Sequence, residues 1–129
     1  MKFNSVRLII SFQILLIMSS LEKELKALDD KYWALILIKE EQENMEWIPF
    51  INALDRICKA LLMISNDPSK TTHITQFEWF KLTMQLKAVC EELGKAYSIV
   101  GKHECTKFYK TMAKAFEAKL NFISVKPVT

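Results

Sequence analysis

Glycine and proline are scarce in this chain of 129 residues, which contains two glycines and three prolines. Domains built from β-strands need many tight turns, and tight turns draw heavily on these two residue types. A phosphate-binding loop needs several glycines close together, whereas Gly94 and Gly101 stand seven positions apart. The scarcity therefore argues against an all-β domain and against a nucleotide-binding loop, and it favours helices.

Histidine and cysteine are also few, and their spacing does not suit a metal site or a catalytic nucleophile. The two histidines are His73 and His103, whereas a zinc site needs three or four converging ligands. His103 and Cys105 lie about 200° apart around a regular helix, so they cannot share one ion. Neighbouring acids, such as those at 91–92, also point in different directions on a helix. We therefore expect no catalytic residues, no metal and no cofactor, and predict that the protein is not an enzyme.

Arginine occurs only twice, at Arg7 and Arg56, so lysine carries nearly all of the positive charge. Guanine recognition and two-point phosphate binding favour arginine, and we therefore expect nucleic acid not to be the partner. A stripe of lysines in the last predicted helix suits an anionic partner, such as lipid head groups or an acidic protein. The simpler interpretation is the solvated side of an amphipathic helix. The stripe consists of Lys107, Lys110 and Lys114.

The N-terminal segment has an apolar run at residues 8–18, preceded by two basic residues and followed by two serines. The run is too short for a membrane-spanning helix, which needs about 18 or more apolar residues. Its outline is that of a secretory signal peptide, although Ser11 and Gln13 interrupt the apolar stretch. Three interpretations stay open: an apolar core helix, a cleaved signal peptide and a membrane-associated anchor. We favour a cytoplasmic protein, and expect a secreted one if residues 1–20 are cleaved.

Capping and spacing signals place the first helices. Ser19 followed by Glu22 fits a helix start. Residues 32–38 are apolar on every side, so periodicity does not separate helix from strand, but the lack of a credible partner strand favours helix. Pro49 marks a boundary, because proline is tolerated only in the first turn of a helix. Apolar residues then recur at intervals of three and four over residues 50–64, until a turn cluster ends that helix.

The best helix start is the capping box formed by Thr75 and Glu78. It opens a seam of apolar residues from 79 to 100, which predicts a long helix packed along a neighbour. Gly94 lies inside this predicted helix and costs about 1 kcal/mol relative to alanine, so an uninterrupted helix and a break near Gly94 both stay open. Gly101 suits a C-terminal cap, and a last helix follows. The apolar side of this last helix is Cys105, Phe108, Tyr109, Met112, Phe116, Leu120 and Ile123.

These segments predict a single all-α domain over residues 1–129, built as a bundle of four to five helices in an antiparallel, up-and-down arrangement. The chain is rich in aromatic and methionine side chains, with eight Phe, three Trp, three Tyr and six Met. Core packing is the simpler interpretation of this content, and a pocket or groove for an apolar ligand or partner helix is the alternative. The candidate lining residues are Trp33, Phe77, Trp79, Phe80, Phe108, Tyr109, Met112 and Phe116.

Two functions fit these features. We expect a non-enzymatic interaction module that binds a protein partner, or a second copy of the chain, through an amphipathic helix face. The alternative is a helical carrier of a lipid or another small apolar ligand. An enclosed apolar cavity on the order of several hundred Å³ favours the carrier, whereas a filled core counts against it.

Overall fold

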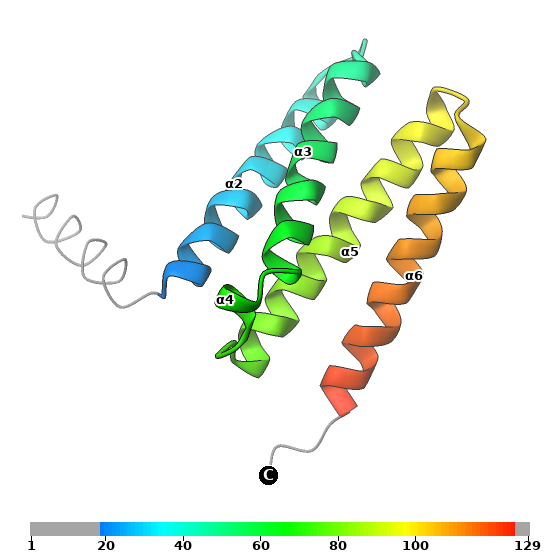
Figure 1. Cartoon of the computed structure of the whole chain (residues 1–129). Helices are drawn as coiled ribbons and strands as arrows, with labels where there is room; N and C mark the ends of the chain where they lie inside the picture. Colours follow the sequence, from blue (N-terminus) through cyan, green and yellow to red (C-terminus); the bar gives the residue numbers. More distant parts are fainter. Residues whose placement is uncertain (1–18, 126–129) are drawn as a thin grey trace, which may run out of the picture.

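The computed structural model describes residues 19–125, so the predicted apolar helix or signal peptide at residues 1–18 lies outside the described residues. The described part consists of four long helices and one short helix, without a strand. Figure 1 shows that the long helices run alternately up and down, which confirms the predicted all-α, antiparallel bundle. The bounds are α2 Ser20–Glu41, α3 Trp47–Ser65, α4 Pro68–Thr71, α5 Gln76–Ile99 and α6 His103–Val125.

The starts of α2 and α3 follow the local signals. Ser19 caps α2, since its hydroxyl accepts a hydrogen bond from the backbone N–H of Glu22 at 3.1 Å. Residues 32–38 lie within α2, so the segment that periodicity leaves ambiguous is helical. α3 begins at Trp47, which places Pro49 in the first turn, where its missing N–H costs no intrahelical hydrogen bond.

α5 is continuous from end to end, so the break considered at Gly94 does not occur. Its start is the predicted capping box: the Thr75 hydroxyl accepts from the Glu78 N–H at 3.1 Å, and the Thr75 N–H donates to the Glu78 carboxylate at 3.2 Å. Gly94 lies where α5 approaches α6 closely. A Cβ added there would be 3.3 Å from Cγ of Lys110 and 3.8 Å from the carbonyl oxygen of Thr106.

The reversal between α5 and α6 depends on Gly101, whose φ of 78° lies in the left-handed region. Its N–H donates to the Ser98 carbonyl at 3.2 Å, and the Lys102 N–H donates to the Tyr97 carbonyl at 2.9 Å. This pair of hydrogen bonds is a Schellman motif, which satisfies carbonyls left open at a helix end. The predicted glycine cap is therefore confirmed.

α5 is the central helix, because it packs against α2, α3 and α6. α2, α3 and α5 also pack against one another, whereas α6 packs chiefly on α5 at the edge of the bundle (Figure 1). The Tyr109 hydroxyl of α6 donates a hydrogen bond to the Asp55 carboxylate of α3 at 3.0 Å. Within residues 19–125, no helix combines the length and apolar content needed to cross a bilayer.

Candidate functional site

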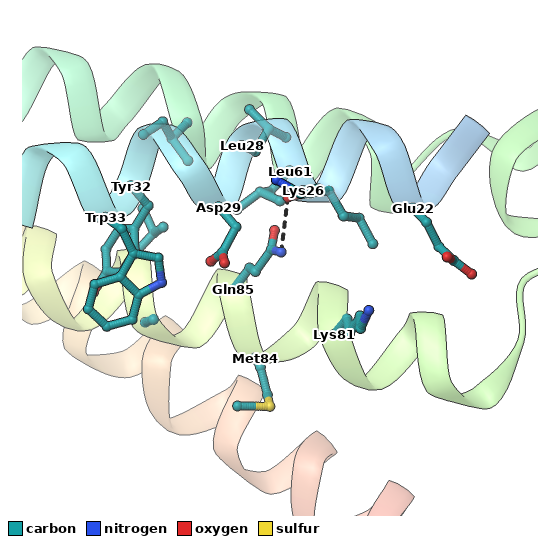
Figure 2. A pocket seen from close by; sticks show the side chains of 14 residues that line it. Glu22, Lys26, Leu28, Asp29, Tyr32, Trp33, Leu61, Lys81, Met84 and Gln85 are labelled. Carbon is teal, nitrogen blue, oxygen red and sulfur yellow. Dashed lines mark hydrogen bonds between the residues drawn. The ribbon is translucent and has the colours of Figure 1, made fainter. Parts of the chain in front are cut away.

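A groove of about 550 Å³ lies between α2 and α5, and is called the α2–α5 groove. Its floor is apolar, because Leu25, Ile57 and Leu61 of the core line it from beneath. Figure 2 shows Trp33 of α2 and Met84 of α5 among its lining residues. Trp33 is 56% exposed and Met84 is 48% exposed. Both helices therefore present large apolar side chains to solvent at this groove.

The groove carries a carboxylate, Asp29, that has no salt-bridge partner among residues 19–125. Burial and the neighbouring Asp30 raise the pKa of Asp29 above its ordinary value, although Lys26, a side-chain hydrogen bond with Trp33 and the charge of Lys81 act in the opposite direction. Lys26 is paired with Asp30, at 3.0 Å between Nζ and Oδ2. Lys81 of α5 lies over the Phe77 ring at 4.6 Å. Asp29 is therefore a negative charge that its surroundings compensate only in part.

Gln85 of α5 adds a polar group to the lining of the same groove (Figure 2). Its Nε2 donates to the Leu25 carbonyl of α2 at 3.1 Å, which ties the two helices together. Its Oε1 is buried and has no hydrogen-bond partner in the described part of the chain. A donor that reached this oxygen would relieve the free-energy cost of an unfilled buried acceptor.

A second groove, of about 610 Å³, is called the α5–α6 groove. Trp79 and Leu86 of α5 line it together with Phe116 and Phe122 of α6. Lys119 belongs to the same lining, and its ammonium nitrogen lies 5.6 Å from the centre of the Phe116 ring. This groove therefore places one cation beside a largely apolar surface.

The eight candidate lining residues do not share one pocket. Trp33 lines the α2–α5 groove, whereas Trp79 and Phe116 line the α5–α6 groove. Phe77 and Phe80 line a third hollow, of about 410 Å³, at the start of α5 and the end of α6. The aromatic content of the chain is therefore divided among separate surfaces.

The other three candidates lie on α6. Tyr109 and Met112 are partly buried and pack against the core. Tyr109 stacks on Tyr97 with 5.5 Å between ring centroids, and burial together with the hydrogen bond to Asp55 raises its pKa. The expectation that Phe108 shares this inner side is wrong, because Phe108 is 58% exposed. Phe108 precedes Tyr109 directly, so the two side chains leave the helix about 100° apart.

The three lysines of the predicted stripe are all exposed on α6. None of them forms a salt bridge with another residue in the range 19–125. Lys110 lies against Gly94 of α5, since Cγ of this lysine is the nearest atom to a Cβ added at the glycine. An anionic partner for Lys107, Lys110 and Lys114 stays a prediction.

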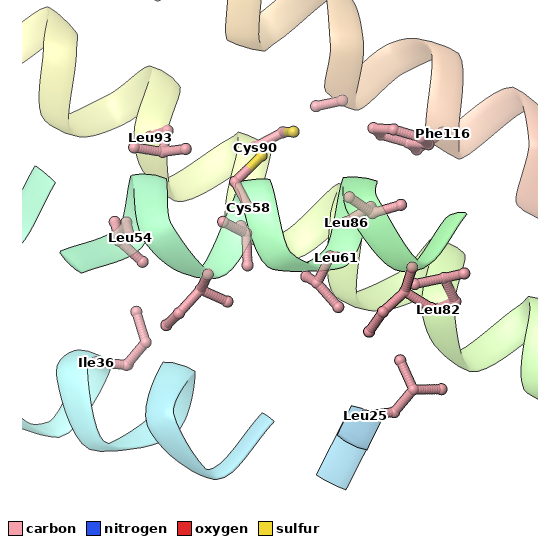
Figure 3. Packing of buried hydrophobic residues seen from close by; sticks show 14 of the residues in the cluster. Leu25, Ile36, Leu54, Cys58, Leu61, Leu82, Leu86, Cys90, Leu93 and Phe116 are labelled. Atoms are coloured by element: carbon pink, nitrogen blue, oxygen red, sulfur yellow. The ribbon is translucent and has the colours of Figure 1, made fainter. Parts of the chain in front are cut away.

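Beneath the grooves lies one cluster of buried apolar side chains, part of which is drawn in Figure 3. Cys58 of α3 and Cys90 of α5 are buried side by side, and the Cys58 thiol together with burial raises the pKa of Cys90. Cys90 therefore stays a thiol and packs as a small apolar side chain. The leucines that are at most 1% exposed are Leu25, Leu54, Leu61, Leu82 and Leu93.

No metal site is formed in the part of the chain that the structure describes, because no three His, Cys, Asp or Glu side chains converge there. Comparison with family models, with curated proteins and with solved structures found no match. Function is therefore inferred from the grooves, their charges and the exposed helix faces.

Sequence reasoning missed most residues of the α2–α5 groove. Met84 and Ala88 of α5 line it, and Leu37 adds exposed apolar surface on α2 one turn beyond Trp33. In the sequence, the sign of this groove is one pair of apolar residues on each helix: Trp33 with Leu37 on α2, and Met84 with Ala88 on α5. The members of each pair are four positions apart, so they lie on the same side of their helix. These pairs define a groove only once α2 is known to lie beside α5.

Proposed function

We propose that the protein is a non-enzymatic interaction module that binds an amphipathic helix of a protein partner in the α2–α5 groove. The observation that carries this proposal is an open apolar groove with Trp33 and Met84 exposed along it. Aromatic and methionine side chains are enriched at protein interfaces, and tryptophan is common among the few residues that dominate binding energy.

The dimensions of the groove suit a helix of a few turns. Its lining on α2 extends from Glu22 to Trp33. This stretch corresponds to about 16 Å, or roughly three turns, along the helix axis. A partner helix of that length presents apolar residues three and four positions apart, and it would cover the exposed side chains of both rims.

The charge of Asp29 selects among such helices. A lysine or arginine of the partner beside Asp29 would favour the ionised carboxylate and lower its raised pKa. An acidic residue of the partner at the same place would be repelled by Asp29, and the partial burial of Asp29 would strengthen this repulsion because less water screens the two charges. We therefore propose a partner helix that carries a basic residue between its apolar anchors.

A library of displayed helical peptides tests this proposal. Apolar residues are fixed at positions i, i+3, i+4 and i+7, the positions between them are random, and binding is measured by fluorescence anisotropy. Selected peptides should carry lysine or arginine between the anchors. Trp33→Ala should weaken their binding at least tenfold, since truncating a tryptophan that anchors an interface costs roughly 2 kcal/mol or more. Asp29→Lys should select acidic peptides instead.

Met63→Ser is the matched control, because Met63 is 74% exposed on α3 and lies outside the groove lining. This variant should bind the selected peptides as tightly as the wild-type protein does. Peptides that bind the Trp33→Ala protein with unchanged affinity would refute the groove as the binding site.

A lipid or another small apolar ligand is the second candidate, and the α5–α6 groove is the feature that favours it. Phe116 and Phe122 supply apolar surface there, and Lys119 supplies a cation for a carboxylate or phosphate head group. Titration with the fluorescent fatty acid cis-parinaric acid tests this candidate, with Phe122→Asp as the variant expected to abolish the signal. The absence of a fluorescence increase with the wild-type protein would reject the carrier.

A further inference from the structure

A smaller groove, of about 370 Å³, lies between α2 and α3 and is called the α2–α3 groove. Its lining extends from Leu28 to Leu35 on α2 and from Ala53 to Ala60 on α3. Leu28 and Ile57 also belong to the lining of the α2–α5 groove, whereas the other lining residues are separate from it. The two grooves therefore lie on neighbouring sides of α2.

Small side chains make up much of the lining of the α2–α3 groove. Ala34 of α2 is exposed, and Ala53 and Ala60 of α3 are half-buried. The distance between two packed helices depends on the side chains at their contact, so alanines allow the axis of a further helix to come close. The groove is therefore shaped for a helix that lies along it.

Two cations stand at the middle of the α2–α3 groove, one on each helix. Lys31 is the fourth residue of the lining stretch on α2, and Arg56 is the fourth residue of the stretch on α3. Since α2 and α3 run in opposite directions (Figure 1), both residues lie near the centre of the groove. Both are exposed, and neither forms a salt bridge within residues 19–125.

The acidic residues next to these two cations in the sequence are paired with other lysines. Asp30 pairs with Lys26 at 3.0 Å, and Asp55 pairs with Lys59 at 2.9 Å. No acidic residue stands three or four positions from either cation, so neither has a helical ion-pair partner on its own helix. The lining of the groove contains no acidic residue either. Both positive charges are therefore available to a partner.

We propose that the α2–α3 groove binds an amphipathic helix of a protein partner that carries an aspartate or glutamate at its centre. The carboxylate would lie between the two cations. The guanidinium of Arg56 offers two parallel N–H donors to its oxygens, and Lys31 adds a compact positive charge. This preference is the opposite of the one proposed for the α2–α5 groove, where Asp29 favours a basic residue.

Exposed apolar side chains lie beyond both ends of the groove. Ile38 is 43% exposed and stands seven positions from Lys31, and Met63 is 74% exposed and stands seven positions from Arg56. Residues seven positions apart share one side of a helix, and the antiparallel arrangement places these two at opposite ends. The distance between them along the groove is roughly 20 Å, or about four turns of helix. A partner helix with apolar residues about two turns before and after its acid would contact both.

The central position of the cations favours a helix over a small apolar acid. A fatty acid carries its carboxylate at one end of the chain. A carboxylate held at the middle of the groove would leave only about 6 Å of the lining, half of its length along the helix axis, for the acyl chain. An acidic side chain of a helix has apolar neighbours on both sides, which matches the alanines and the exposed ends of the groove.

Selection of displayed helical peptides tests the proposal. The target is the full chain carrying Trp33→Ala, which removes an exposed anchor of the α2–α5 groove, so that the two groove proposals succeed or fail separately. Apolar residues are fixed at positions i−7 and i+7, and the positions between them are random. Selected peptides should carry aspartate or glutamate at position i. Selection of no peptide, or of peptides without an acid at this position, would overturn the proposal.

Charge variants in the same background test the site, with binding measured by fluorescence anisotropy. Lys31→Glu and Arg56→Glu should each weaken binding at least about fivefold, through the loss of a charged contact and the gain of repulsion. Arg56→Lys should retain part of the affinity, because it keeps the charge but loses the two-point geometry. The double variant Lys31→Glu, Arg56→Glu should select peptides with lysine or arginine at position i. Far-UV circular dichroism should show unchanged helicity, because both side chains are exposed.

Lys114→Glu is the matched control, because it makes the same charge change at an exposed lysine of α6 outside the groove. This variant should bind the selected peptides with unchanged affinity. Equal weakening by Lys114→Glu and Lys31→Glu would mean that only the net charge of the protein matters, and would overturn the site. Decanoate is the probe for a small apolar acid. Decanoate binding that Arg56→Glu abolishes, with no peptide selected, would assign the groove to such an acid instead of a helix.

Discussion

Gly94 offers a quantitative test of how closely α5 and α6 pack. Glycine inside a helix costs about 0.5–1 kcal/mol relative to alanine, so Gly94→Ala removes that cost. The new Cβ would lie 3.3 Å from Cγ of Lys110, and 3.7 and 3.8 Å from the Lys110 nitrogen and the Thr106 carbonyl oxygen. The backbone distances are ordinary contacts, and the lysine stem can shift by a few tenths of an ångström. We therefore expect Gly94→Ala to raise the free energy of unfolding by about 0.5 kcal/mol.

A larger side chain at the same position should have the opposite effect. Gly94→Leu would extend into the Thr106 backbone, and overpacking of this kind typically costs about 1–3 kcal/mol. Both variants are measured by urea unfolding, followed by far-UV circular dichroism, with the slope checked for constancy. Ala27→Gly, on the exposed side of α2, measures the cost of glycine relative to alanine in a helix of the same protein where no packing contact changes. A neutral effect of Gly94→Leu would refute the close approach of α5 and α6. A loss above about 1 kcal/mol for Gly94→Ala would instead refute the expectation that the Lys110 stem can shift to make room for a methyl group.

Three other substitutions test the core, a turn and a titration. Leu61→Ala should lower the free energy of unfolding by about 2–5 kcal/mol in urea, because Leu61 is fully buried; a smaller loss would contradict the burial of this side chain among packed neighbours. Gly101→Ala should cost about 1–2 kcal/mol in thermal unfolding, since alanine is strained at a φ of 78°. The pKa of Tyr109 is raised, so the folded state holds its proton more tightly than the unfolded state does. The contribution of Tyr109 to the free energy of unfolding is fully present below pH 10, the ordinary pKa of tyrosine, and it is lost as the pH rises through the raised pKa of the folded state. Tyr109→Phe should therefore flatten the loss of stability at alkaline pH. If the loss of stability is unchanged in this variant, Tyr109 is not its source.

Helix boundaries were predictable because they depend on neighbouring residues. The capping box at Thr75 and the glycine at Gly101 act within one turn of chain, and both occur as expected. The fate of Gly94 was not predictable in the same way. The low helix propensity of glycine favours a break at this position. In the structure α5 is uninterrupted there, and the absence of a side chain at Gly94 lets α6 approach closely at Lys110 and Thr106.

The sides of α6 show where sequence periodicity is insufficient. Phe108, Tyr109 and Met112 are all apolar in character, and two lines of apolar residues run along the helix. Only the position of α5 decides which line is inner, and it selects the one with Tyr109 and Met112. The grooves were unpredictable for the same reason, because each is formed by residues from helices that are distant in sequence.

The late position of α6 in the chain has a consequence during synthesis. α2, α3 and α5 pack against one another without α6, and α6 is the last of the described helices to be synthesised. A nascent chain therefore reaches a three-helix stage in which the side of α5 around Trp79 and Gly94 still faces water. Until α6 has folded back at Gly101, this side is an exposed apolar surface of the kind that makes incompletely folded chains prone to aggregation.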